Sequence, residues 1–191
     1  PEFWSNLRRR PAQQHLSAIA HAPKILLRQA LFYALLCAGT GASLPFLPLW
    51  LRESGMTPSQ IAWILAVPLL GRAITGPISG IWADQFQKYR TPIALLALAA
   101  TLSYAFMTMV RDWTEHRFTA LMLFYAIGYT GITNITPLLD AMTLQLSRIE
   151  HFAFGMARAA GSASFVFANI CLGYLLLSVG TKATLLWMIL T

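Results

Sequence analysis

The sequence predicts an all-α membrane protein with five complete transmembrane helices and the start of a sixth. Of its 191 residues, 57% are hydrophobic and only 11% are charged, whereas about a quarter of the residues of a soluble domain are charged. The apolar residues also form successive runs, each close to the roughly 20 residues that a helix needs to cross a bilayer core. This composition excludes an ordinary soluble domain.

Each apolar run predicts one helix, in order along the chain. The runs cover residues 30–51, 61–83, 91–110, 118–147 and 159–181. A sixth run begins at Ala183, and the chain stops at Thr191, too soon to cross a bilayer. The chain also starts without a methionine. We therefore expect a piece of a longer protein, with a basic tail over residues 1–28 and an incomplete six-helix bundle over residues 29–191.

The connections between the runs are short, which predicts antiparallel neighbouring helices. Lysine and arginine concentrate on the cytoplasmic side of a membrane protein and so indicate its orientation. With the N-terminus inside, the inner segments carry Arg8, Arg9, Arg10, Lys24, Arg28, Lys88, Arg90, Arg148 and Arg158, and the outer ones Arg52, Arg111, Arg117 and Lys182. We therefore expect a cytoplasmic N-terminus, with a tail that touches anionic lipid; a transit peptide is the less favoured interpretation of the tail.

Several other classes of function are not indicated. The net charge of +7 does not suggest nucleic-acid binding, because the basic residues lie in the tail and between apolar runs. Cys37 and Cys171 lie inside apolar runs and the histidines have no ligand spacing, so neither a metal nor a cofactor is expected. The chain also lacks His-Glu-x-x-His, Gly-x-Ser-x-Gly and paired intramembrane aspartates, so we do not expect an enzyme.

Two charged residues lie in the helices on either side of the fourth connection. Asp140 and Arg158 are each nine residues from Ile149, at the middle of the polar segment over residues 147–151. A hairpin that turns over this segment places both residues about 10 Å from the turn, at 1.5 Å per residue. Adjacent helices lie about 8–10 Å apart, a gap that a carboxylate and a guanidinium can close directly or across a bound polar molecule. We expect the two residues to be partners.

The stability of the protein does not explain why this ion pair is present, because two apolar residues in its place usually give a protein that is at least as stable. We favour a polar site that faces a water-filled cavity; an ion pair that fixes helix register is the alternative. Arg72, near the middle of the second run, either faces the same cavity or pairs with a carbonyl of the fourth helix or with Asp140. Asn134 either adds an amide to the cavity wall or bonds across helices, and Tyr33 either lines the cavity or, as we favour, packs between helices.

Three stretches resemble the lactose permease group of the major facilitator superfamily. The most specific is PLLDAMTLQLSRIEHFAFGMARAAGS, residues 137–162, and PFLPLWL, residues 45–51, also resembles a pattern of that group. GIWADQFQKYR, residues 80–90, resembles the superfamily signature between helices two and three, but Gln85 and Gln87 depart from it. The matching positions are Pro137, Asp140, Arg148, Phe152, Phe154, Gly155, Arg158 and Gly161 in the first stretch, and Gly80, Asp84, Lys88 and Arg90 in the signature.

The resemblance implies a chain that forms most of the N-terminal half of a twelve-helix transporter, with its substrate at the midplane between two six-helix halves. It implies a secondary active transporter in a plasma membrane, expected to be a bacterial inner membrane. The expected activity is proton-coupled symport of a small polar or anionic solute, such as a sugar or a nucleoside, by alternating access. A non-transporting receptor or scaffold of the same fold is the alternative.

The resemblance also assigns roles to residues. It implies that Asp140 and Arg158 contact the substrate, and that Phe165 provides an aromatic face where the permease has a tryptophan. A solvated loop is the alternative interpretation of Asp84, Lys88 and Arg90, but the signature residues are expected to control the change between inward-open and outward-open states. They are Gly80, Asp84, Lys88 and Arg90.

Overall fold

The computed structural model of the chain describes residues 2–86, 89–111 and 115–191. These residues form six α-helices and no strand, which confirms the predicted all-α class. The helices are α1 (Glu2–Glu53), α2 (Pro58–Ala83), α3 (Arg90–Val110), α4 (Arg117–Ile149), α5 (Phe154–Val179) and α6 (Lys182–Leu190).

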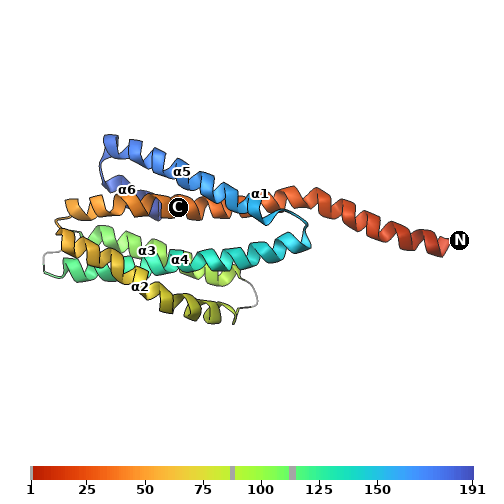
Figure 1. Cartoon of the computed structure of the whole chain (residues 1–191), viewed down its shortest axis with the longest axis horizontal. Helices are drawn as coiled ribbons and strands as arrows, with labels where there is room; N and C mark the ends of the chain where they lie inside the picture. The colour runs from red at the N-terminus through yellow and green to blue at the C-terminus, as the bar shows by residue number, and fades with distance from the viewer. Residues whose placement is uncertain (1, 87–88, 112–114) are drawn as a thin grey trace.

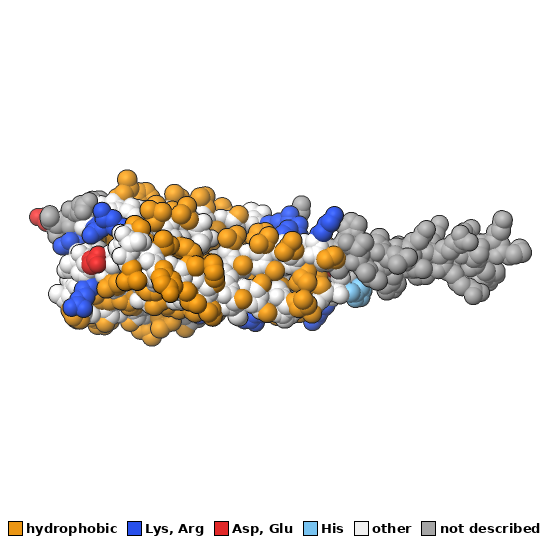
Figure 2. Space-filling view, turned by 90° about the horizontal axis from the view of Figure 1, so that it is seen from above, with side chains coloured by type: hydrophobic (Ala, Val, Ile, Leu, Met, Phe, Trp, Pro, Cys, Tyr) orange, Lys and Arg blue, Asp and Glu red, His pale blue; other side chains and the backbone are white. Residues whose placement is uncertain are grey.

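Five stretches of helix are long and apolar enough to cross a membrane, as predicted. They are Pro23–Glu53 within α1, and the whole of α2, α3, α4 and α5. Figure 2 shows hydrophobic side chains covering most of one face of the bundle, with lysines and arginines gathered near its two ends. This is the distribution expected of a bundle surrounded by lipid.

Two helix starts differ from the apolar runs. α1 begins at Glu2, so helical backbone continues through the segment assigned to the tail. α5 begins at Phe154, five residues before the predicted start at residue 159. Hydropathy alone misplaced this start, because the apolar run stops at Arg158, whereas the helix includes Arg158 and begins before it at Phe154.

The helices form two groups (Figure 1). α1 packs along α5, and α6 lies beside both, whereas α4 packs against α2 and α3. α4 and α5 are consecutive in the sequence but touch only over a short stretch. The core contains the buried side chains of Leu47, Trp50, Leu51, Met56, Ile64, Ala100, Tyr104, Met107, Val110, Leu121, Tyr125, Leu185 and Met188.

Glycines allow the closest approaches between helices. A Cβ atom added at Gly161 of α5 would lie 2.9 Å from Cys37 Sγ and 3.2 Å from Tyr33 Cβ, both on α1. On α4, a Cβ at Gly131 would lie 2.9 Å from the carbonyl oxygen of Leu96. The hydrophobic effect does not drive helices together within lipid, because lipid tails are as apolar as the helix surfaces. Helices in membranes therefore associate through close van der Waals packing, which small residues allow.

Candidate functional site

Asp140 and Arg158 form an ion pair. The Nη1 atom of Arg158 lies 3.7 Å from Oδ2 of Asp140, so the pairing predicted from the sequence is present. The side chain of Arg158 is 56% exposed and that of Asp140 is 28% exposed. The distance exceeds the roughly 3.2 Å limit of a good N–H···O hydrogen bond, so each group keeps hydrogen-bonding capacity for a third molecule.

The ends of α4 and α5 bring these two residues together in a way that the sequence did not predict. Glu150 to Ala153 connect the helices, so Arg158 lies in the second turn of α5, whereas Asp140 is nine residues before the last residue of α4. Figure 1 shows that α4 extends beyond the start of α5 at this end of the bundle. This offset compensates for the unequal spacing and leaves both side chains at the same level.

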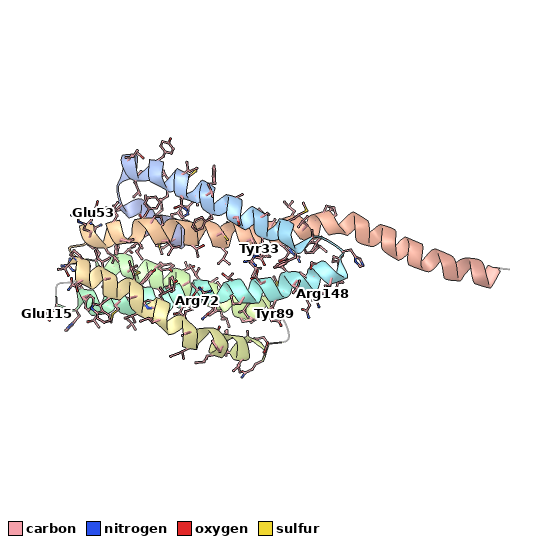
Figure 3. All side chains as sticks on the ribbon, in the orientation of Figure 1. Tyr33, Glu53, Arg72, Tyr89, Glu115 and Arg148 are labelled. Carbon is pink, nitrogen blue, oxygen red and sulfur yellow. The ribbon has the colours of Figure 1, made fainter. Side chains whose placement is uncertain are left out.

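Tyr33 of α1 completes the site. Its hydroxyl donates a 2.5 Å hydrogen bond to Oδ1 of Asp140, and its side chain is only 3% exposed. Figure 3 shows Tyr33 on α1 on the side facing α4. The hydroxyl fixes one carboxylate oxygen of Asp140 while the other faces Arg158. Tyr33 is therefore a polar partner of Asp140 as well as a packed residue, and the interpretation as packing alone missed this hydrogen bond.

A second polar pair lies one helical turn from the first. Thr143 donates a 3.1 Å hydrogen bond to Oε1 of Gln29, and both side chains are fully buried. Gln29 precedes Tyr33 by four residues and Thr143 follows Asp140 by three, so each helix presents its two polar groups on one face. This spacing is visible in the sequence, but hydropathy does not show which faces of α1 and α4 meet.

Apolar side chains surround the ion pair. The guanidinium of Arg158 lies 5.9 Å from the centre of the Phe154 ring, within the range of a cation–π contact. Leu139 and Ala157 are buried beside Tyr33, with Leu36 and Met142 packed against them. Such neighbours cover the Tyr33 side of the site, where a low local dielectric strengthens the hydrogen bond between Tyr33 and Asp140.

Phe165 and Asn134 lie away from the pair. Phe165 is seven residues after Arg158, about 10 Å along α5, and a Cβ added at Gly41 of α1 would lie 3.1 Å from its ring. Asn134 is only 2% exposed, inside the bundle. The structure therefore does not bring either residue to the ion pair.

Arg72 lines a separate pocket of about 200 Å³. It does not pair with Asp140, and no ion pair of Arg72 occurs within the described parts of the chain. Figure 3 shows Arg72 on the part of α2 that lies beside α4. The pocket is also lined by Thr40, Leu44, Tyr104, Tyr129, Ile132, Thr133 and Thr136.

The signature segment lies at the end of α2 and the start of α3. Asp84 caps α2, and Asp84 and Arg90 line a pocket of about 590 Å³ beside the end of α4. A Cβ atom added at Gly80 would meet nothing within 4 Å. Lys88 lies outside the described residues. Among the residues placed by the structure, no three His, Cys, Asp or Glu side chains are grouped to hold a metal ion.

The chain matches the model of one protein family. The model of the MFS_1 like family matches residues 26–191. A maltose permease of Geobacillus stearothermophilus is 29% identical over 147 residues, which is 76% of this chain and 36% of that protein. The quinolone resistance protein NorA of Staphylococcus aureus is 26% identical over 134 residues, which is 69% of this chain and 33% of that protein. This chain thus spans about a third of each relative, and no solved structure matches it significantly.

Proposed function

The chain belongs to the MFS_1 like family, and from this premise we propose that it forms most of the N-terminal half of a secondary transporter. The transporter moves a small polar or anionic solute across a plasma membrane, a bacterial inner membrane in our proposal, by alternating access and in symport with protons. The observation that carries this proposal is the pair of Asp140 and Arg158, which lies inside a transmembrane bundle and leaves the guanidinium accessible.

The geometry suits a solute with hydroxyl groups. Arg158 is a rigid fork of N–H donors, and its 3.7 Å separation from Asp140 leaves donors free for solute oxygens. The carboxylate of Asp140 accepts from a solute hydroxyl while Tyr33 holds it in place. A solute that binds both groups forms hydrogen bonds with them that an apolar wall cannot provide.

Two further residues extend this proposed wall. Phe165 provides an aromatic face two turns along α5, against which an apolar ring face can stack. Asn134 adds an amide only where the helices around it separate, since it is buried in the state described here. We therefore propose Asp140 and Arg158 as the principal contacts, with Phe165 and Asn134 as subordinate ones.

The names of the relatives suggest which solutes to test. One relative is a maltose permease and the other a quinolone resistance protein. The pair of Asp140 and Arg158 favours maltose, the more polar of the two solutes, because an apolar molecule offers the charged groups few hydrogen bonds. Maltose, a quinolone and a six-carbon hydroxy acid therefore form the first panel for the purified complete protein.

Reconstitution into proteoliposomes separates a transporter from a receptor or scaffold of the same fold. We expect one solute of the panel to enter vesicles in exchange for the same solute preloaded inside. When this solute is added to vesicles that start without a pH gradient, the co-transported protons should make the lumen more acidic. Solute binding without any flux would instead favour the receptor. Flux without a change in lumenal pH would remove the proton from the proposal.

The orientation is a prediction that fusions can test. We propose a cytoplasmic N-terminus, because the inner segments carry more lysine and arginine than the outer ones. A reporter inserted after Gly55, between α1 and α2, should then be external, and one inserted after Phe86, between α2 and α3, should be cytoplasmic. The opposite pattern at both sites would reverse the orientation and with it the assignment of the inner basic residues.

Asp84 is proposed to control the transport cycle together with Gly80, Lys88 and Arg90. Its exposed position at the end of α2, and the open space around Gly80, support a contact with the other half of the transporter. Asp84→Asn should change the ratio of inward-open to outward-open molecules, measured by spin-label distances, and leave solute affinity for the outward state within about twofold. A loss of affinity of roughly tenfold or more would instead make Asp84 a solute contact.

A further inference from the structure

Arg72 places a positive charge deep in the membrane-spanning part of α2. Such a charge is costly, so a structural role alone does not explain it. Arg72 is 14 residues after Pro58 and 11 before Ala83, so it lies about 21 Å and about 17 Å from the two ends of the helix. At such depth the guanidinium cannot reach the headgroup layer easily, and a charge there costs roughly 2.5–3.5 kcal/mol on insertion scales.

No carboxylate of the described chain compensates this charge. Within the described spans, Asp140 is the one acidic residue away from a helix end, and its oxygens are engaged by Arg158 and Tyr33. The pair of Asp140 and Arg158 is neutral as a unit. The proposed cavity wall therefore carries one net positive charge, and that charge is at Arg72.

The pocket around Arg72 adds hydrogen-bond donors. Thr136 and Tyr129 line it, and their hydroxyls form no hydrogen bond within the residues that the structure covers. Leu44 and Ile132 close the pocket with apolar surface. A guanidinium beside free hydroxyls and apolar walls is suited to an oxyanion, which accepts hydrogen bonds and neutralises the charge.

The two sites lie on the same side of α4. Thr136 precedes Asp140 by four residues, so their side chains share one face of the helix, about 6 Å apart along its axis. One small solute can therefore span both. We infer that the Arg72 pocket is a subsite for the carboxylate or phosphate group of the transported solute, whose hydroxyl groups occupy the site at Asp140 and Arg158. The inference rests on the proposed transport function and narrows its substrate to a hydroxylated anion.

The test measures thermal unfolding of the purified complete protein with defined anions at equal ionic strength. Acetate and inorganic phosphate distinguish a carboxylate subsite from a phosphate subsite, and chloride is the reference. Gluconate is compared with sorbitol, which has a hydroxymethyl group in place of the carboxylate. We expect at least one oxyanion to raise the melting temperature above that in chloride, and gluconate to raise it more than sorbitol does.

Variants then locate the effect. Arg72→Gln should weaken binding of the active oxyanion by roughly tenfold or more, whereas Arg72→Lys, which keeps the charge, should retain part of it. Arg52→Gln, which removes an exposed arginine at the end of α1, is the matched control and should change nothing. Asp140→Asn should reduce the additional effect of gluconate, because the hydroxyl groups of gluconate are proposed to bind at Asp140 and Arg158.

Two results would overturn the inference. One is the absence of any oxyanion effect that depends on Arg72. The other is an effect of gluconate no larger than that of sorbitol, which would show that the carboxylate contributes nothing to binding. Solute flux without Arg72-dependent binding would contradict this inference alone, and Arg72-dependent binding without flux would contradict the proposed function alone.

Discussion

Replacing Arg158 by lysine is expected to remove most solute flux through the complete protein, although the positive charge is kept. Arg158 is four residues after the first residue of α5, and its Nη1 atom pairs with Asp140 of α4. Its other N–H groups remain available to bind solute oxygens. A lysine ammonium is a compact charge without a planar fork, so it cannot hold Asp140 and two solute oxygens in the same geometry. We expect flux to fall by roughly tenfold or more, measured in proteoliposomes with equal amounts of folded protein.

The matched control makes the same change at a neighbouring arginine. Arg148 is exposed in the last turn of α4, and Arg148→Lys should leave flux close to that of the wild-type protein. If Arg158→Lys transports as well as Arg148→Lys does, the guanidinium of Arg158 has no specific role in the solute site.

The other members of the site should give graded losses. Asp140→Asn should reduce flux about as strongly as Arg158→Lys, because a neutral amide accepts weakly and leaves Arg158 without its counter-ion. Tyr33→Phe removes one hydrogen bond to a charged group, worth roughly 1.5–3 kcal/mol, and should weaken solute affinity by roughly tenfold while flux at high solute concentration persists. An equal and complete loss in Tyr33→Phe would indicate a structural failure.

Gly161→Ala is expected to destabilise the bundle more than another alanine on the same helix. The added Cβ would lie 2.9 Å from Cys37 Sγ and 3.2 Å from Tyr33 Cβ, whereas a Cβ at Gly173 meets only Phe46, at 3.8 Å. We expect Gly161→Ala to cost about 1–3 kcal/mol, measured by thermal unfolding, because overfilling a packed contact forces the helices apart. Gly173→Ala should be close to neutral.

A double variant locates the cause of this loss. Cys37→Ala removes the sulfur nearest to position 161, so Gly161→Ala should be milder in a Cys37→Ala background. The strain also moves α5 relative to Tyr33, and we expect weaker solute binding in Gly161→Ala. Equal stability of Gly161→Ala and Gly173→Ala would show that close packing of α1 on α5 does not position the site.

Much of the fold follows from the sequence because a bilayer imposes a simple rule. A span needs about 20 apolar residues, so the runs around α2, α3 and α4 give these helices nearly their observed bounds. The same rule does not show which helices pack together. Consecutive α4 and α5 barely touch, whereas α1 packs along α5 at Gly161 and at Ser164, whose hydroxyl donates to the carbonyl of Ala34. Those contacts depend on small residues that hydropathy does not distinguish.

The candidate site was predictable in part for a related reason. Asp140 and Arg158 stand out because each charge is costly in a span, and a hairpin places them within reach of each other. Tyr33 does not stand out, since tyrosine is common in membrane helices and its role depends on which face of α1 meets α4. Arg72 was recognised as unusual, but its separation from Asp140 is a matter of helix packing that the sequence does not specify.

We propose that Asp140 and Arg158 bind the transported solute and do not merely hold α4 and α5 together. A double variant, Asp140→Leu with Arg158→Met, tests it most directly, because an ion pair with only a structural role can be replaced by apolar residues of similar size at little cost in stability. The measurement is solute flux through a double variant that is expressed and unfolds at the wild-type temperature. We predict that this folded protein transports nothing; flux comparable to that of the wild-type protein would contradict the claim.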